Sequence, residues 1–394
     1  MKGRIDMDIN VEFEKMFGAA PVAVAAAPGR LEVLGNHTDY NDGLVLSAAA
    51  RMRTTFAVIP TEGDECEVAT TSFGGSVERF SLRALLESRD AGGGWSAYVK
   101  GMMLELDARG VDLGAFNALI DSDIPLSAGM SSSAALEIST GFALGAAFGA
   151  ELAKEDWARA GQAVENKHMG LQSGLLDQFS SIFGEKNKLI LCDFRDVVVE
   201  GTIPMPENLV FVVANSMVKH DLVDSDYNVR RESCERVVAL LKEKKGMEIS
   251  ALRDVSTAEL EAAGDAIPIQ DLRIASHVTG ENERVRAGVD ALKSGDAEAF
   301  GRLMYESHES SIHNFANSCP ELDCLVELSK SIPGCLGARL SGGGFGGISI
   351  HLVEADEAET YRKRLETAYL REMGKETTTL VCPIGGGASV LREP

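Results

Sequence analysis

Apolar residues gather in short segments separated by small and polar residues, a pattern that predicts β-strands. An amphipathic helix over residues 11–16 is expected to precede the first strand. That strand should end at Pro28-Gly29, because this pair is typical of a turn. The expected strands cover residues 22–26, 43–50, 54–59, 66–71, 115–121, 209–214, 338–340, 347–352 and 377–381.

Longer segments predict helices, and their order along the chain indicates the class of fold. The expected helices cover residues 96–109, 131–148, 156–168, 228–244, 269–293 and 297–312. Strands and helices of the first half do not alternate strictly, so an α+β fold is favoured over a doubly wound parallel sheet. The length of 394 residues, and Pro204 and Pro206 ahead of an apolar strand, predict two domains, residues 1–205 and 206–394.

The charge of the chain restricts its partners. Sixty acidic and 38 basic side chains give a net charge of −22. A surface this acidic repels nucleic-acid phosphates and anionic lipids, so we expect neither as a partner. A site for a phosphorylated ligand must therefore depend on a few nearby groups and not on the overall charge of the surface.

Neither a membrane helix nor a disulfide framework is expected. The longest stretch without charged side chains, residues 377–391, is interrupted by proline and glycine and is shorter than the roughly 20 residues that span a bilayer. Acidic residues precede the apolar run 16–29, where a signal peptide would be basic. Seven cysteines without a C-x-x-C motif predict reduced thiols and a cytoplasmic protein.

A serine-rich segment, residues 125–135, places small residues and three hydroxyls where a helix should begin. The free amides and the dipole of a helix N-terminus bind anions, and small side chains let phosphate oxygens approach the backbone. Ordinary N-capping by serine remains an alternative. A Walker loop is excluded, because the motif G-x-x-x-x-G-K-[ST] is absent.

A glycine-rich segment, residues 341–347, contains G-x-G-x-x-G at Gly342, Gly344 and Gly347. A strand is expected to follow, whereas a dinucleotide fingerprint opens a helix, so a dehydrogenase is disfavoured. The segment is either an irregular bend between strands or a place where bare backbone approaches a ligand or another loop.

Two further segments carry polar groups that could bind a ligand. In the turn-rich stretch 28–43, Arg30, Asn36, His37 and Asp39 could converge on a polyhydroxylated molecule, although a solvated loop is equally possible. In residues 174–179 one acid, Asp177, is embedded in apolar residues, where a carboxylate must be paired, functional or a helix cap.

Taken together, these four segments resemble the galactokinase branch of the GHMP small-molecule kinases. They occur in one order between residues 28 and 347, and smaller similarities lie at residues 95–101, 225–235, 306–308 and 318–322. The resemblance covers nearly the whole chain. It implies an α+β fold of two domains flanking a cleft, and ATP-dependent phosphorylation of galactose at its anomeric hydroxyl. Because galactokinase-like sensors have a disrupted serine loop and residues 131–135 are intact, a non-catalytic sensor is the less favoured alternative.

The resemblance also assigns roles to residues. Asp177 would be the general base, and Arg30 would stabilise the transferring phosphoryl group and keep Asp177 ionised. Magnesium would be held by Ser132 and Glu165. The other implied contacts are Gly129, Ser131, Ser132 and Ser133 for the triphosphate, Trp95 for adenine, Asn36, His37, Asp39, Gly174, Asp177 and Tyr227 for the sugar, and the glycine motif Gly342, Gly343, Gly344, Gly346 and Gly347.

Three positions depart from the family pattern. Galactokinases carry glutamate in place of Asn36, and a neutral amide could accept a sugar with a carboxylate at C6. Galacturonate is therefore an alternative substrate to galactose. Ser127 replaces a common glycine of the phosphate loop, and residues 312–315 replace a more acidic stretch for which the sequence offers no physical account.

Overall fold

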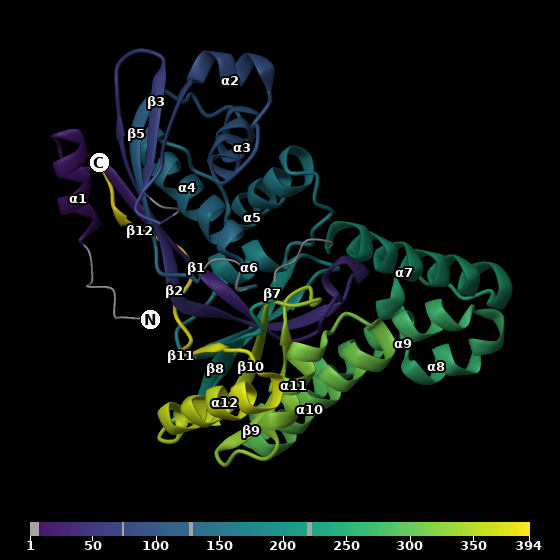
Figure 1. Ribbon diagram of the computed structural model, residues 1–394. Helices are drawn as coiled ribbons and strands as arrows, with labels where there is room; N and C mark the ends of the chain where they lie inside the picture. Colours follow the sequence, from purple (N-terminus) through teal and green to yellow (C-terminus); the bar gives the residue numbers. More distant parts are fainter. Residues whose placement is uncertain (1–7, 73–74, 126–128, 219–222) are drawn as a thin grey trace.

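A large mixed sheet forms the N-terminal half of the computed structural model (Figure 1). The structure describes residues 8–72, 75–125, 129–218 and 223–394, without the side chains of 223–227 and 244–245. The strand order is β12-β1-β2-β5-β3-β4, with β6 paired to β2 and β7 to β6. The strands are β1 (Ala23–Leu34), β2 (Leu44–Pro60), β3 (Glu65–Thr70), β4 (Val77–Ser81), β5 (Phe116–Ser122), β6 (Lys188–Asp193), β7 (Val198–Pro204) and β12 (Ser389–Arg392).

Strand β1 does not end at Pro28-Gly29, so this part of the sequence prediction is wrong. The strand continues to Leu34, and a shift of register against β2 between Pro28 and Arg30 accommodates the proline. A side chain at Gly29 would place its Cβ 2.5 Å from the carbonyl oxygen of Met130. The Pro28-Gly29 pair therefore does not form a turn. It allows β1 to pack closely against the serine-rich segment. The two strands predicted over residues 43–59 are likewise one strand, β2.

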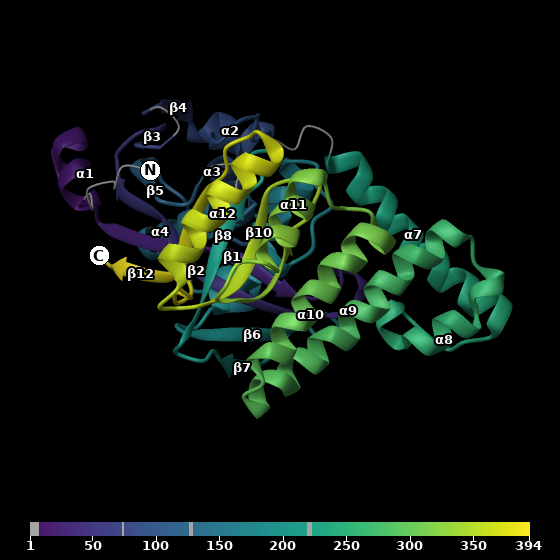
Figure 2. The ribbon, with the colours of Figure 1, turned by 60° about the horizontal axis from the view of Figure 1, so that its bottom comes forward.

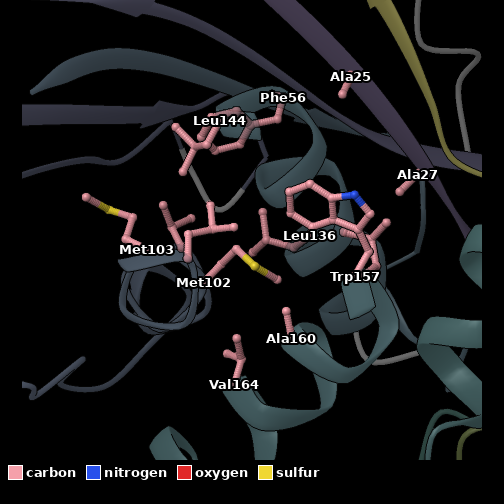
Figure 3. Packing of buried hydrophobic residues seen from close by; sticks show 14 of the residues in the cluster. Ala25, Ala27, Phe56, Met102, Met103, Leu136, Leu144, Trp157, Ala160 and Val164 are labelled. Atoms are coloured by element: carbon pink, nitrogen blue, oxygen red, sulfur yellow. The ribbon is translucent and has the colours of Figure 1, made fainter. Parts of the chain in front are cut away.

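Helices cover both faces of this sheet because the side chains of β1 alternate between them. Ala23, Ala25 and Ala27 face a core formed with α3 (Ser96–Asp107), α4 (Ser132–Phe148), α5 (Lys154–Ala163) and α6 (Leu176–Phe183). Figure 3 shows Trp157 of α5 in this core on the side of Ala25 and Ala27, with Met102 and Met103 of α3 on the side of Leu144. Val24 faces the other side and packs against α1 (Ile9–Phe17), while α2 (Leu82–Ser88) follows β4.

A second, antiparallel sheet, in the order β11-β8-β10-β9, forms the C-terminal half (Figure 1), and Figure 2 shows α11 and α12 lying over its strands β8 and β10. One face packs against α11 and α12, and the other face shares a core with α9, α10 and the end of β1. The strands are β8 (Leu209–Asn215), β9 (Cys335–Ser341), β10 (Ile348–Glu354) and β11 (Thr378–Cys382). The helices are α7 (Val223–Lys245), α8 (Thr257–Ala262), α9 (Ile269–Ser294), α10 (Ala297–Ser310), α11 (Pro320–Ser329) and α12 (Ala358–Met373).

The α+β class is confirmed, and the expected boundary near residue 205 falls in the connection between β7 and β8. Strand β12, near the C-terminal end of the chain, nevertheless pairs with β1 of the N-terminal half. The division into two domains stays a prediction. Among the described residues, no helix is both long and apolar enough to cross a membrane. All seven cysteines carry free thiols.

Candidate active site

A cavity of about 250 Å³ opens where β1, the start of α6 and the glycine-rich turn after β9 meet. Loop 170–174 and α7 complete its wall. Segments from both halves of the chain therefore form one site, as the resemblance implied. The lining residues are Arg30, Glu32, His37, Asp39, Glu165, Gly170, Leu171, Gln172, Ser173, Gly174, Leu176, Asp177, Asn228 and Gly343.

An ion pair between Arg30 and Asp177 lies in the wall of this cavity. Nε of Arg30 is 2.7 Å from Oδ1 of Asp177, and Nη1 donates a hydrogen bond of 2.7 Å to the carbonyl oxygen of Gly129. Arg30 is 6% exposed, so the guanidinium is held in one orientation. Asp177 sits in the first turn of α6, where the helix dipole favours a carboxylate. The structure thus brings together two residues that are 147 positions apart.

The serine-rich segment leads into α4 beside this ion pair. Ser131 has a left-handed backbone with φ of 53°, and its hydroxyl donates a hydrogen bond to Oδ2 of Asp177. This contact was not foreseen from the sequence, which gave Ser131 only a phosphate role. Ser132 begins α4, and Gly129, with φ of 67°, precedes it. Residues 126–128, including Ser127, lie outside the described residues.

Glu165 lies in the same wall, within a short π-helical segment, Val164–His168. Its carboxylate accepts hydrogen bonds from Ser133, at 3.2 Å, and from Ser173, at 2.5 Å. Burial, and next the negative charge of Asp177, raise the pKa of Glu165. Two facing carboxylates beside hydroxyls are a donor set that fits Mg²⁺. No three His, Cys, Asp or Glu residues of the described chain form a metal site by themselves, so phosphate oxygens would have to supply further ligands.

Asp39 and Gly174 meet at the cavity. A Cβ on Gly174 would overlap Oδ2 of Asp39 and would lie 2.5 Å from its Cγ. Glycine at 174 therefore lets the Asp39 carboxylate approach the loop ahead of α6. Burial, and next the charges of Glu32 and Asp177, raise the pKa of Asp39 to about 7.

This raised pKa has a consequence for stability. Between the ordinary pKa of aspartate and about 7, folded protein holds a proton at Asp39 that unfolded chain releases. The wild-type protein should therefore lose about 2 kcal/mol of unfolding free energy between about pH 5 and about pH 8, and Asp39→Asn should remove this loss. Urea denaturation at both pH values measures it. The matched control is Asp290→Asn, an exposed position on α9, which should keep the wild-type pH slope. The same slope in Asp39→Asn would contradict the assignment.

His37 lines the cavity, but both of its ring nitrogens already have protein partners. Nε2 donates to the carbonyl oxygen of Gly343 at 3.1 Å, and Nδ1 accepts from the hydroxyl of Tyr40 at 3.0 Å. Burial lowers the pKa of His37 to about 3, so the ring is neutral. Phe315 stacks on this ring at 4.3 Å, which gives one residue of the unexplained stretch 312–315 a packing role.

Asn36, which was expected to contact the sugar, is not among the described residues that line the cavity. Its side chain is 0% exposed. Nδ2 donates to Oε1 of Glu32 at 2.6 Å and to the carbonyl oxygen of Gly342 at 3.0 Å, and Oδ1 accepts from Asn317 at 3.1 Å. Its neighbour Glu32, which was not singled out from the sequence, lies in the wall instead.

Side chains of helix α9 make hydrogen bonds to the backbone of the loop after β1. The backbone amides of Gly35 and Asn36 both donate to Oε2 of Glu281 at 2.8 Å, and Nε2 of His277 donates to the Asn36 carbonyl oxygen at 3.2 Å. Burial lowers the pKa of His277 to about 4, so this ring is neutral. A signal for Glu281 existed in the sequence, because it lies at helical spacing within the apolar stripe of Ile274, Val278 and Val285.

The glycine-rich turn approaches other loops closely, which is the second of the two interpretations open from the sequence. A Cβ on Gly342 would lie 3.4 Å from Nη2 of Arg30, and one on Gly344 would overlap the carbonyl oxygen of Asn317. Gly342 and Gly344 also have positive φ, of 89° and 86°. Of the remaining motif glycines, Gly343 lines the cavity, and Gly346 and Gly347 have positive φ, of 137° and 76°.

Two other expected contacts are not seen at this cavity. Trp95 precedes α3 and packs, partly buried, against the N-terminal core, and it is not among the residues that line the cavity. The side chain of Tyr227 lies outside the described part of the chain. Their roles toward adenine and sugar stay predictions.

Three family models match the chain: the galactokinase galactose-binding signature at residues 11–60, the GHMP kinases N terminal domain at 97–185 and the GHMP kinases C terminal at 289–371. A galactokinase from Chloroflexus aggregans is 38% identical over 383 residues, which cover 97% of each chain. The galactokinase of Homo sapiens is 37% identical over 389 residues, covering 96% of this chain and 95% of the relative.

Solved structures with the same arrangement include a Lactococcus lactis galactokinase complexed with galactose. It is 32% identical with a TM-score of 0.90, covering 97% of this chain and 98% of the other. A Methanococcus jannaschii mevalonate kinase has a TM-score of 0.63 at 21% identity, covering 92% and 98%, and shares the fold.

Proposed function

The chain belongs to the galactokinase family of GHMP kinases, and on this premise we propose that it transfers the γ-phosphoryl group of ATP to the anomeric hydroxyl of galactose. The product is galactose 1-phosphate. The observation that carries the proposal is the ion pair between Arg30 and Asp177 in the cavity wall, beside the start of α4.

Each part of this arrangement has a task in phosphoryl transfer. Asp177 accepts the proton of the anomeric hydroxyl as that oxygen attacks. Arg30 offsets the negative charge on the transferring group. The free amides at the start of α4 bind phosphate oxygens, with Gly129 and the serines leaving the backbone accessible. Magnesium, held by Glu165 and Ser132, supplies charge neutralisation on the phosphates when it is bound.

Galactose is favoured over galacturonate by the charges around the cavity. Four carboxylates line it: Glu32, Asp39, Glu165 and Asp177. Among the described lining residues, Arg30 is the only lysine or arginine, and it is already paired with Asp177. The C6 carboxylate of galacturonate would be repelled by these groups. The galacturonate alternative rested on the absence of a carboxylate at Asn36, and Glu32 supplies one nearby.

A coupled assay for ADP release tests the proposal. Purified full-length protein is incubated with Mg-ATP and, in separate reactions, galactose, glucose, galacturonate or no sugar. We expect sugar-dependent ADP release to be fastest with galactose, and ³¹P NMR to identify a 1-phosphate. No turnover with any sugar would contradict the kinase proposal, and galactose binding without ADP release would favour a sensor.

Replacing Gly174 with alanine should weaken galactose use. The new Cβ would displace the Asp39 carboxylate, and we expect kcat/KM for galactose to fall about 10- to 100-fold. Gly201→Ala is a matched control, because nothing lies within 4 Å of a Cβ there, and it should keep wild-type kinetics. Unchanged kcat/KM in a folded Gly174→Ala protein would show that the position of Asp39 is not needed.

A further inference from the structure

We propose that Glu32 determines sugar specificity by accepting a hydrogen bond from a hydroxyl of the substrate, and that Asn36 orients Glu32 without touching the sugar. This inference rests on the proposed galactokinase function and assigns the group that reads the sugar in this chain. Family members carry glutamate at the position of Asn36, so the carboxylate comes here from four residues earlier.

The position of Glu32 directs its carboxylate to the cavity. Glu32 lies two residues after Arg30 on β1, and alternate residues of a strand share a face. Both side chains line the cavity. The Glu32 side chain is nevertheless nearly buried, with the residue only 4% exposed. The Glu32 side chain is therefore shielded from bulk solvent, and the cavity is where a ligand can contact it.

The two oxygens of Glu32 differ in their surroundings. Oε1 accepts from Nδ2 of Asn36 at 2.6 Å and lies 3.4 Å from Nη1 of Arg339. Oε2 makes no hydrogen bond to any described residue of the chain, and it is also not among the described buried oxygens that lack a partner. Oε2 is therefore open to the cavity. A carboxylate oxygen in an enclosed site gains from a hydroxyl donor, because leaving it unpaired is costly.

Arg339 supports the charge on Glu32 from inside the protein. It is 0% exposed, and its Nη1 also donates to the carbonyl oxygens of Glu32 and Val33, at 3.1 and 3.3 Å. Its Nε and Nη2 are buried without a hydrogen-bond partner. Burial raises the pKa of Glu32, whereas Arg339 and then Arg30 lower it. The buried cation thus offsets part of the cost of ionising Glu32, whose pKa stays raised because burial is the larger effect.

Asn36 cannot take over this role without losing its own contacts. Its amide is enclosed between Glu32, the carbonyl oxygen of Gly342 and Asn317. Turning toward the cavity would leave buried polar groups unpaired. The backbone of Asn36 is also fixed by Glu281 and His277. Asn36 is therefore a positioning residue, and Asn36→Ala should raise KM for galactose with little change in kcat.

The direct test measures which hydroxyl each protein recognises. The substrates are galactose and the analogues in which the hydroxyl at C2, C3, C4 or C6 is replaced, one at a time, by hydrogen or fluorine. A carboxylate acceptor requires a donor, so both replacements at the recognised position should lower wild-type kcat/KM about 10- to 100-fold. In Glu32→Gln that loss should shrink to about threefold or less, while losses at the other positions remain. The ratio of galacturonate to galactose kcat/KM should also rise.

Controls separate this role from a structural one. Glu62→Gln, at an exposed position, should reproduce the wild-type pattern. Glu32→Asp keeps the charge beside Arg339 but withdraws the carboxylate from the cavity, so it should lose the same discrimination, and thermal melting shows whether the variant is folded. Wild-type discrimination at every hydroxyl in a folded Glu32 variant would overturn the inference.

A crystal structure of the wild-type chain with galactose decides the question even if the variants do not fold. We expect Oε2 of Glu32 within about 3.2 Å of a sugar hydroxyl. A sugar bonded to Asn36, or not bonded to Glu32, would overturn the inference. Lack of galactose turnover by the wild-type protein would instead contradict the proposed function, whereas turnover with unaltered discrimination contradicts only the role of Glu32.

Discussion

Asp177→Asn should reduce kcat about 10²- to 10⁴-fold at saturating galactose and ATP. The amide keeps the size of the side chain but cannot accept the proton of the anomeric hydroxyl. The contacts around it are arranged for a carboxylate, since Oδ1 accepts from Arg30 and Oδ2 accepts from Ser131. Steady-state ADP release measures the change, and isothermal titration with galactose should show that the sugar still binds.

Ser131→Ala provides a graded comparison for this result. It removes a hydrogen bond to Asp177 but leaves the base in place, so we expect a smaller loss of about 3- to 30-fold. If Asp177→Asn keeps kcat within threefold of wild type, Asp177 is not the general base. If Ser131→Ala is as inactive as Asp177→Asn, the hydroxyl has a role of its own at the phosphates.

Arg30→Ala should lower kcat about 10³-fold, the size of effect seen when an arginine is removed from a phosphoryl-transfer site. The loss has two physical sources. The transferring group loses a buried cation, and Asp177 is left near Glu165 and Asp39 without its partner. Steady-state ADP release at saturating galactose and Mg-ATP measures the loss.

Arg30→Lys is the matched variant for this measurement. It keeps a positive charge but cannot make both the Nε contact to Asp177 and the Nη1 contact to Gly129. We expect activity between those of Arg30→Ala and wild type. Full activity in Arg30→Ala would contradict any part for this residue in stabilising the transferring group.

Much of the fold could be predicted because many elements are set by local pattern. Helices α3 and α9 and strands β8 and β10 lie within a few residues of their expected bounds. Elements without a distinctive pattern were missed, among them α6, which carries Asp177, and the short strand β12. Helix α6 has only eight residues, and the residue before its start, Leu175, provides no side-chain cap that the sequence could signal.

The site was predicted as a set of residues but not as an arrangement. The motifs drew attention to Arg30, Asp39, Gly174 and Asp177, which line one cavity, and their roles in the reaction stay predictions. They assigned a sugar contact to Asn36 because of its position in the sugar signature of the family. The structure instead encloses Asn36 and turns Glu32 to the cavity wall.

By itself, the sequence determined the class of fold, the family and the chemical groups available, because strand and helix periodicity, helix starts and turn residues are properties of neighbouring positions. Only the tertiary structure decided that β1 passes through Pro28-Gly29, that Asn36 is held by Glu281 from 245 positions away, and that Glu32 faces the cavity. These outcomes depend on which surfaces pack together, and small differences in burial and hydrogen bonding between distant segments select among conformations that local pattern leaves equally possible.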